Sequence, residues 1–196
     1  MKIYDEETRK LEAKLTGEDA PIPGHSSRIS CVKIDKENPN IVVTGGWDTK
    51  VLVWDIRGKN PVRAIIGPRI FGEAVDVFED YILTCSHSEE TPMQLWDLGT
   101  GLKVTDVAWE SGKTSVDTAL LYCGAFSKVD GSLMLGAGKI TNECKIFDRN
   151  HFDDHVATIH GITREIVCAD FSNQGNMFAI AGGDGYIRVF LTSVIA

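Results

Sequence analysis

The segment Leu52-Val53-Trp54-Asp55 decides the fold, because four other segments of the chain repeat its form. Each is a short run of β-favouring residues that ends on an aromatic side chain and, in all but the last, an aspartate. The four are Lys2-Ile3-Tyr4-Asp5, Gln94-Leu95-Trp96-Asp97, Lys145-Ile146-Phe147-Asp148 and Arg188-Val189-Phe190-Leu191. The fourth residues of the five segments lie at 5, 55, 97, 148 and 191, so the intervals are 50, 42, 51 and 43 residues. This spacing predicts a repeated unit with loops of varying length.

Turn sequences recur in phase with these segments and predict an all-β fold. They are rich in Asn, Asp, Gly and Pro, as in Asn38-Pro39-Asn40, and each is followed by a short apolar run. The runs predict strands at Ile41 to Thr44, Ser132 to Leu135 and Met177 to Ile180. Thr8 to Leu15 is also expected to form a strand, because of its place in the repeat. Short strands with turns every 8 to 12 residues are typical of all-β proteins.

The first complete repeat has a specific set of landmarks. Gly24-His25 is followed by Thr44-Gly45-Gly46-Trp47-Asp48 and then by Trp54-Asp55. With this order and spacing the sequence resembles the WD40-repeat family of β-propellers. The resemblance implies four-stranded blades around a channel, with each repeat supplying the outer strand of one blade and three strands of the next.

The resemblance covers residues 1–196 as one segment of a WD40 β-propeller with about four blades. It implies an outer strand of a preceding blade in 1–23, blades in 24–66, 67–109 and 110–159, and an incomplete blade in 160–196. The family usually closes with seven blades, which at ~40–45 residues each requires ~300 residues. We therefore expect a partial, C-terminal section of a larger propeller. Two alternatives are blades supplied by a partner chain, and a small ring closed by the Thr8 to Leu15 strand.

Four residues match the structural tetrad of the family: His25, Thr44, Asp48 and Trp54. The resemblance implies that they satisfy one another's polar groups inside a blade, which disfavours a hydrolase built on the same side chains. No catalytic or cofactor-binding residue is predicted. A zinc site at His151 and His155, which are expected to flank a turn, is disfavoured against a solvated loop. Asp76 and Asp170 lie on expected strands without a partner that the sequence identifies.

Trp47 directly precedes the tetrad aspartate, and the resemblance places it on the top face of the propeller. A large aromatic side chain there is a candidate anchor for a protein partner, with packing against a neighbouring blade as the alternative. Five further residues lie in loops expected on the same face: Arg28, Arg69, Phe71, His87 and Arg164. Together with Trp47 they would suit an acidic or aromatic peptide.

Composition limits the classes of partner. The 196 residues are 43% hydrophobic and 24% charged, with a net charge of −8. The acidic balance disfavours nucleic acid as the main partner. No apolar run approaches the ~18 residues that a membrane helix needs, and the acidic start shows no secretory signal. The five cysteines form no C-x-x-C pair and are expected to be buried, reduced thiols. We expect a cytoplasmic location, with the nucleus as an alternative.

These observations predict a scaffold without enzymatic activity that mediates protein–protein interactions in an intracellular complex. Two alternatives remain open. Trp54-Asp55-Ile56-Arg57 is similar to a short W-D-x-R box of substrate receptors of cullin-RING ubiquitin ligases. The chain would equally suit a structural subunit of a coat, nuclear-pore or ciliary assembly. We expect protein or peptide partners, no cofactor and no metal, and further propeller blades in cis or from a partner chain.

Overall fold

The computed structural model describes residues 1–18, 20–88, 91–109 and 119–194. Within them the chain forms antiparallel sheets and one short 3-10 helix, η1 (Thr192–Val194), which confirms the all-β prediction. The first blade contains β3 (Ile29–Ile34), β4 (Ile41–Gly46), β5 (Lys50–Asp55) and β6 (Pro61–Ile66). The second contains β7 (Val75–Phe78), β8 (Tyr81–Cys85), β9 (Met93–Asp97) and β10 (Lys103–Asp106).

The third blade contains β11 (Leu120–Phe126), β12 (Leu133–Lys139), β13 (Cys144–Asp148) and β14 (His151–Ile159). The fourth has three strands, β15 (Ile166–Phe171), β16 (Met177–Gly182) and β17 (Ile187–Leu191). The first residues of the expected third blade, 110–118, lie outside the described residues. In every blade consecutive strands are neighbours, so successive loops alternate between the two ends of the sheet.

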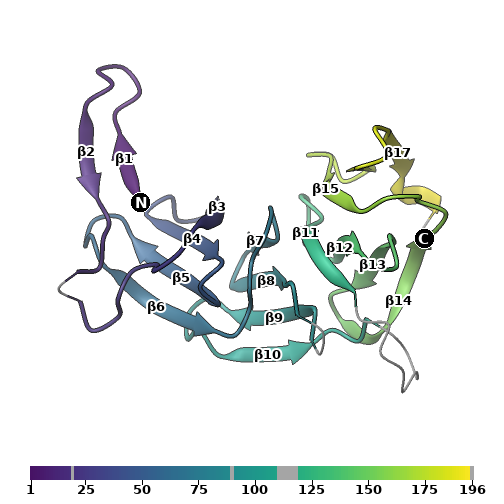
Figure 1. Cartoon of the computed structure of the whole chain (residues 1–196), viewed down its shortest axis with the longest axis horizontal. Helices are drawn as coiled ribbons and strands as arrows, with labels where there is room; N and C mark the ends of the chain where they lie inside the picture. The colour runs from purple at the N-terminus through teal and green to yellow at the C-terminus, as the bar shows by residue number, and fades with distance from the viewer. Residues whose placement is uncertain (19, 89–90, 110–118, 195–196) are drawn as a thin grey trace.

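The four blades form an open arc (Figure 1). The first strands of the blades, β3, β7, β11 and β15, lie on the concave side, and neighbouring ones contact each other. The last strands β6, β10 and β14 lie on the convex rim. A hairpin of β1 (Lys2–Tyr4) and β2 (Leu11–Lys14) stands beside the first blade, at the end of the arc away from β17. The strand predicted at Thr8 to Leu15 is therefore shorter, because the chain turns through residues 6–8.

Alternate side chains of the strands fill the space between blades. One apolar cluster spans the first three blades, and a second joins the third blade to the fourth. A smaller cluster surrounds Trp54 and includes Leu15, just after β2. The core thus holds adjacent blades at fixed positions, which in turn fixes the loops at their ends.

Four of the five cysteines are buried, as expected, but Cys168 is exposed. It lies on β15, where the register against β16 shifts between Ile166 and Cys168. The expectation of five buried thiols is therefore wrong for this residue. No helix in the described part of the chain has the length and apolar character needed to cross a bilayer.

Candidate functional site

The tetrad residues of the first blade form one hydrogen-bonded chain. Trp54 Nε1 donates to Thr44 Oγ1 at 2.8 Å, and Thr44 Oγ1 lies 2.8 Å from His25 Nε2. His25 Nδ1 lies 2.9 Å from Asp48 Oδ1. The side chains of His25 and Asp48 are both only 3% exposed. The arrangement satisfies four buried polar groups at once, which is the role that the sequence resemblance implies.

The same contacts govern the charge of Asp48. Burial raises the pKa of this carboxyl group, but hydrogen bonds from His25 and from the backbone N–H of Ser26 lower it by more. The pKa of Asp48 is therefore below its ordinary value. The neutral imidazole completes the chain when Nδ1 donates to Asp48 and Nε2 accepts from the Thr44 hydroxyl. His25 is therefore engaged at both ring nitrogens by structural partners.

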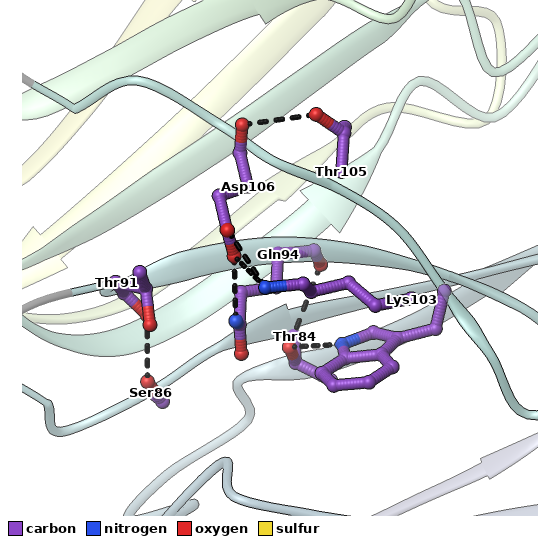
Figure 2. Close-up of polar contacts among 8 residues, drawn as sticks. Thr84, Ser86, Thr91, Gln94, Lys103, Thr105 and Asp106 are labelled. Carbon is purple, nitrogen blue, oxygen red and sulfur yellow. Dashed lines mark hydrogen bonds and ion pairs between the residues drawn. The ribbon is translucent and has the colours of Figure 1, made fainter.

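The second blade retains half of this network. Trp96 Nε1 donates to Thr84 Oγ1 at 2.9 Å, as Trp54 does to Thr44. Figure 2 shows Thr84 beside Gln94, whose side-chain amide donates to Asp106 Oδ1 at 2.7 Å. Lys103 Nζ lies 2.7 Å from the other oxygen of Asp106. The Thr84–Trp96 pair was not predicted from the sequence. In both blades the hydroxyl lies two residues after the residue that pairs with the tryptophan, which is Val42 in the first blade and Ile82 in the second.

The loops at one end of the blades are fixed to one another by backbone hydrogen bonds. Trp47 N donates to Arg28 O at 2.9 Å, and His87 N donates to Arg69 O at 2.9 Å. Ile70 N donates to Gly46 O, which links the second blade to the first. The loops that carry the predicted top-face residues are therefore rigidly placed.

A continuous stack of side chains runs across this end of the first three blades. Trp47 stacks on Phe71 with ring centroids 4.6 Å apart, and Phe71 stacks on His87 at 4.4 Å. His87 lies 5.8 Å from Tyr122. Cations lie 4.6 Å from the Trp47 ring, 5.0 Å from the Phe71 ring and 5.7 Å from the Tyr122 ring. We name these seven residues the stacked patch: Arg28, Trp47, Arg69, Phe71, His87, Tyr122 and Lys139.

The stacked patch differs in two ways from the predicted set. Arg164 lies in the loop before β15, and no ring contact joins it to the patch among the described residues. Tyr122 and Lys139 were missed, although a signal for Lys139 exists. In the first three blades, the Asp that ends the repeated segment pairs with one residue of the second strand. Six residues after that paired residue the chain reaches Trp47, His87 and Lys139 in turn. The corresponding residue in the fourth blade is Gly183.

The carboxylates that the sequence left without a partner share one lysine. Lys128 Nζ lies 3.1 Å from Asp76 Oδ2 and 2.8 Å from Asp170 Oδ1. Asp76 also accepts from Phe126 N at 2.9 Å. These residues come from the second, third and fourth blades, so the ion pairs connect blades. They are explained by structure and do not indicate a catalytic pair.

Two other motifs have structural partners. Arg57 of the W-D-x-R box donates to both oxygens of Asp55, at 2.9 and 2.6 Å, and these bonds lower the pKa of Asp55 to about 2.

His151 and His155 both lie on β14, so the expectation that they flank a turn is wrong; the turn occupies residues 149–150 instead. In the described part of the chain, no three His, Cys, Asp or Glu side chains are grouped to hold a metal ion.

Comparisons with known proteins agree with this architecture. The family model described as "WD domain, G-beta repeat" matches residues 18–55 and 153–190. The chain is 29% identical over 175 residues to a guanine nucleotide-binding protein subunit beta from Zea mays, covering 87% of this chain and 45% of the relative. It is 32% identical over 77 residues to the small ribosomal subunit protein RACK1 from Neurospora crassa, covering 38% of this chain and 24% of the relative.

Among solved structures, the β-propeller domain of Cps50 (Swd1) from Myceliophteria thermophila aligns with a TM-score of 0.79 at 17% identity. The alignment covers 97% of this chain and 58% of that domain. The chain thus spans less than half the length of the two curated relatives described above. The two matched WD repeats, the blade topology and the complete tetrad of the first blade show that this chain contains WD40 repeats and forms a section of a β-propeller.

Proposed function

We propose that this chain acts without catalysis, as a scaffold that binds a protein partner through the stacked patch. WD40 propellers typically serve as non-catalytic scaffolds, and the proposal adds the surface that does the binding. We further propose that the complex is intracellular, in the cytoplasm or nucleus, and that neither nucleic acid nor a membrane is the main partner.

The observation that carries the proposal is the cross-blade stack of Trp47, Phe71 and His87. Three ring systems from two blades are held in register by backbone hydrogen bonds and remain partly exposed. Rigid aromatic and arginine side chains lose little conformational freedom when a partner binds, and such residues dominate the energetics of protein interfaces. The His25–Asp48 pair is by contrast buried, and its polar atoms are engaged in the hydrogen bonds of the tetrad. This engagement disfavours a hydrolase built on the tetrad side chains.

The test is Trp47→Ala in an affinity purification with mass spectrometry, followed by calorimetry on the purified partner. We expect partner binding to weaken by ~2 kcal/mol or more while the melting temperature is retained, since Trp47 packs at the surface end of the sheet. Tyr186→Ala is the matched control: Tyr186 is an exposed aromatic residue at the same end of the fourth blade. Equal loss in both variants, or unfolding of the Trp47 variant, would contradict the proposal.

A further inference from the structure

The order of side chains in the stacked patch determines which parts of the rings a partner meets. Arg28 and Phe71 lie on either side of Trp47, and Trp47 and His87 lie on either side of Phe71. Tyr122 is tilted against His87, and the ammonium group of Lys139 lies over the Tyr122 ring. Neighbouring side chains therefore cover the ring faces of Trp47 and Phe71, so a partner approaching from solvent meets the edges of these two rings.

Ring edges carry the positive part of the aromatic quadrupole. Three cations, Arg28, Arg69 and Lys139, lie over rings of the patch. The patch is therefore electropositive on a chain whose net charge is −8. Such a local reversal of sign selects for an anionic partner.

An acidic pocket lies at the opposite end of the sheets. A pocket of about 410 Å³ lies there between the first and second blades, and Arg63 is the one basic side chain among its described lining residues. Its acidic residues are Asp35, Glu37, Glu79 and Asp80. An anionic segment would thus be repelled by this pocket and attracted by the three cations of the stacked patch.

We propose that the stacked patch binds an acidic segment of a protein partner, with carboxylates placed against the ring edges and against Arg28, Arg69 and Lys139. This inference rests on the proposed function and adds the chemistry of the partner to it. It also favours an acidic over an aromatic peptide, because an aromatic side chain needs a ring face on which to stack, and neighbours already cover the faces of Trp47 and Phe71.

Single-stranded nucleic acid is the other anion that basic and aromatic residues bind. Its affinity depends on stacking of bases on aromatic faces and on a basic groove that follows the backbone. In the stacked patch the faces of Trp47 and Phe71 are covered, and its three cations form no extended basic track. The geometry therefore favours a short run of carboxylates over a polynucleotide.

His87 links this binding to pH. Burial, the charge of Lys139 and the charge of Arg69 lower the pKa of His87, although a hydrogen bond to backbone raises it slightly. Phe71 and Tyr122 are its ring neighbours. A carboxylate bound beside the imidazole would favour its charged form, so the complex takes up a proton and binding tightens as pH falls through the ordinary imidazole value of 6.5.

A carboxylate at the border of the patch provides a test in the opposite direction. Glu165 lines a pocket of about 310 Å³ together with Phe71 and Tyr122. Because Glu165 is anionic, it should repel an acidic segment. Glu165→Gln is therefore expected to strengthen binding about twofold to threefold, an outcome that damage to the fold cannot imitate.

The experiment measures fluorescence anisotropy with a labelled Glu-rich peptide, the same peptide with Gln in place of Glu, and a single-stranded oligouridylate. We expect binding of the acidic peptide alone, weakened about fivefold by Lys139→Gln and by Arg28→Gln, and weakened further by salt. Arg57→Gln is the matched control, because Arg57 is a basic residue in a loop at the opposite end of the first blade. His87→Gln should abolish the gain in affinity at low pH.

Three results would overturn the inference. These are equal binding of the acidic and Gln peptides, preferential binding of the oligouridylate, or a weaker complex with Glu165→Gln. If Trp47→Ala still releases the natural partner while the acidic peptide fails to bind, the proposed function stands and this inference is wrong. If the acidic peptide binds as described but the natural partner is unaffected by Trp47→Ala, the proposed function is wrong.

Discussion

The first and fourth blades have the same strand order but are stabilised by different chemistry. Asp48 and Asp184 occupy corresponding positions after the second strand. Asp48 is held by the buried His25, whereas Asp184 Oδ2 accepts from Arg188 Nη2 at 2.7 Å, within its own hairpin. Where the first blade has a histidine, the fourth has the buried Ile162.

The replacements in the fourth blade are coordinated. Ile180 stands where Thr44 stands, and Phe190 stands where Trp54 stands. The indole donor and its acceptor are thus absent together, and Phe190 stacks on Phe178 at 5.1 Å instead. A half-satisfied buried network costs more than an apolar core. The first and fourth blades therefore show two solutions, a complete polar chain and an apolar contact, and the second blade keeps the Trp96–Thr84 hydrogen bond without a histidine.

The largest effect on this contrast is expected from Thr44→Val. The substitution keeps the shape of the side chain but removes the hydroxyl group that Trp54 and His25 share, so two buried groups lose a partner. We expect the free energy of unfolding to fall by about 3 kcal/mol, as measured by chemical denaturation.

Thr84→Val in the second blade is the matched comparison for Thr44→Val. There the hydroxyl accepts from Trp96 but has no histidine, so the loss should be about half as large. Equal losses would mean that the histidine bond adds nothing to the first blade.

A smaller effect is expected from His25→Ala. The change leaves the Thr44 hydroxyl and the Asp48 carboxylate without their shared partner, and we expect a loss of ~1–3 kcal/mol in the free energy of unfolding. His160→Ala is the control, because the side chain of His160 is 70% exposed. Partner binding should fall only as far as folding does. An unchanged melting temperature with lost activity would instead indicate a catalytic histidine.

The contrast also explains what the sequence could and could not predict. The repeated Leu-Val-Trp-Asp form located the third strand of each blade, because a strand ending on an aromatic residue and a turn-forming Asp is a local property. The tetrad could be recognised because all four residues are present. Tyr122 escaped notice, because it lies inside a strand and reaches the patch only when the blades are packed side by side.

The partners of the inner-strand carboxylates could not be predicted for a similar reason. Lys128 is 52 residues from Asp76 and 42 from Asp170 in the sequence. It meets both only because three blades converge on the concave side. Pairing within one repeat can be inferred from spacing, whereas pairing between repeats depends on the angle between blades.

The smallest expected effect concerns the acid sensitivity of the two aspartates. The pKa of Asp184 is lowered chiefly by its hydrogen bond from Arg188, and the pKa of Asp48 is lowered by its hydrogen bonds in spite of burial. A folded-state pKa below the ordinary value of 3.8 stabilises the protein above that pH, and the contribution is lost as pH falls through the folded-state value. The losses in the free energy of unfolding caused by Asp48→Asn and Asp184→Asn, measured by denaturation at about pH 7, should therefore shrink toward about pH 3.

In about 1 M NaCl at neutral pH the loss caused by Asp184→Asn should also shrink, because Arg188 is partly exposed and its charge is screened. The loss caused by Asp48→Asn should persist in salt, since both side chains of the His25–Asp48 pair are buried. If salt reduces both losses equally, the distinction between a buried network and a surface ion pair is wrong.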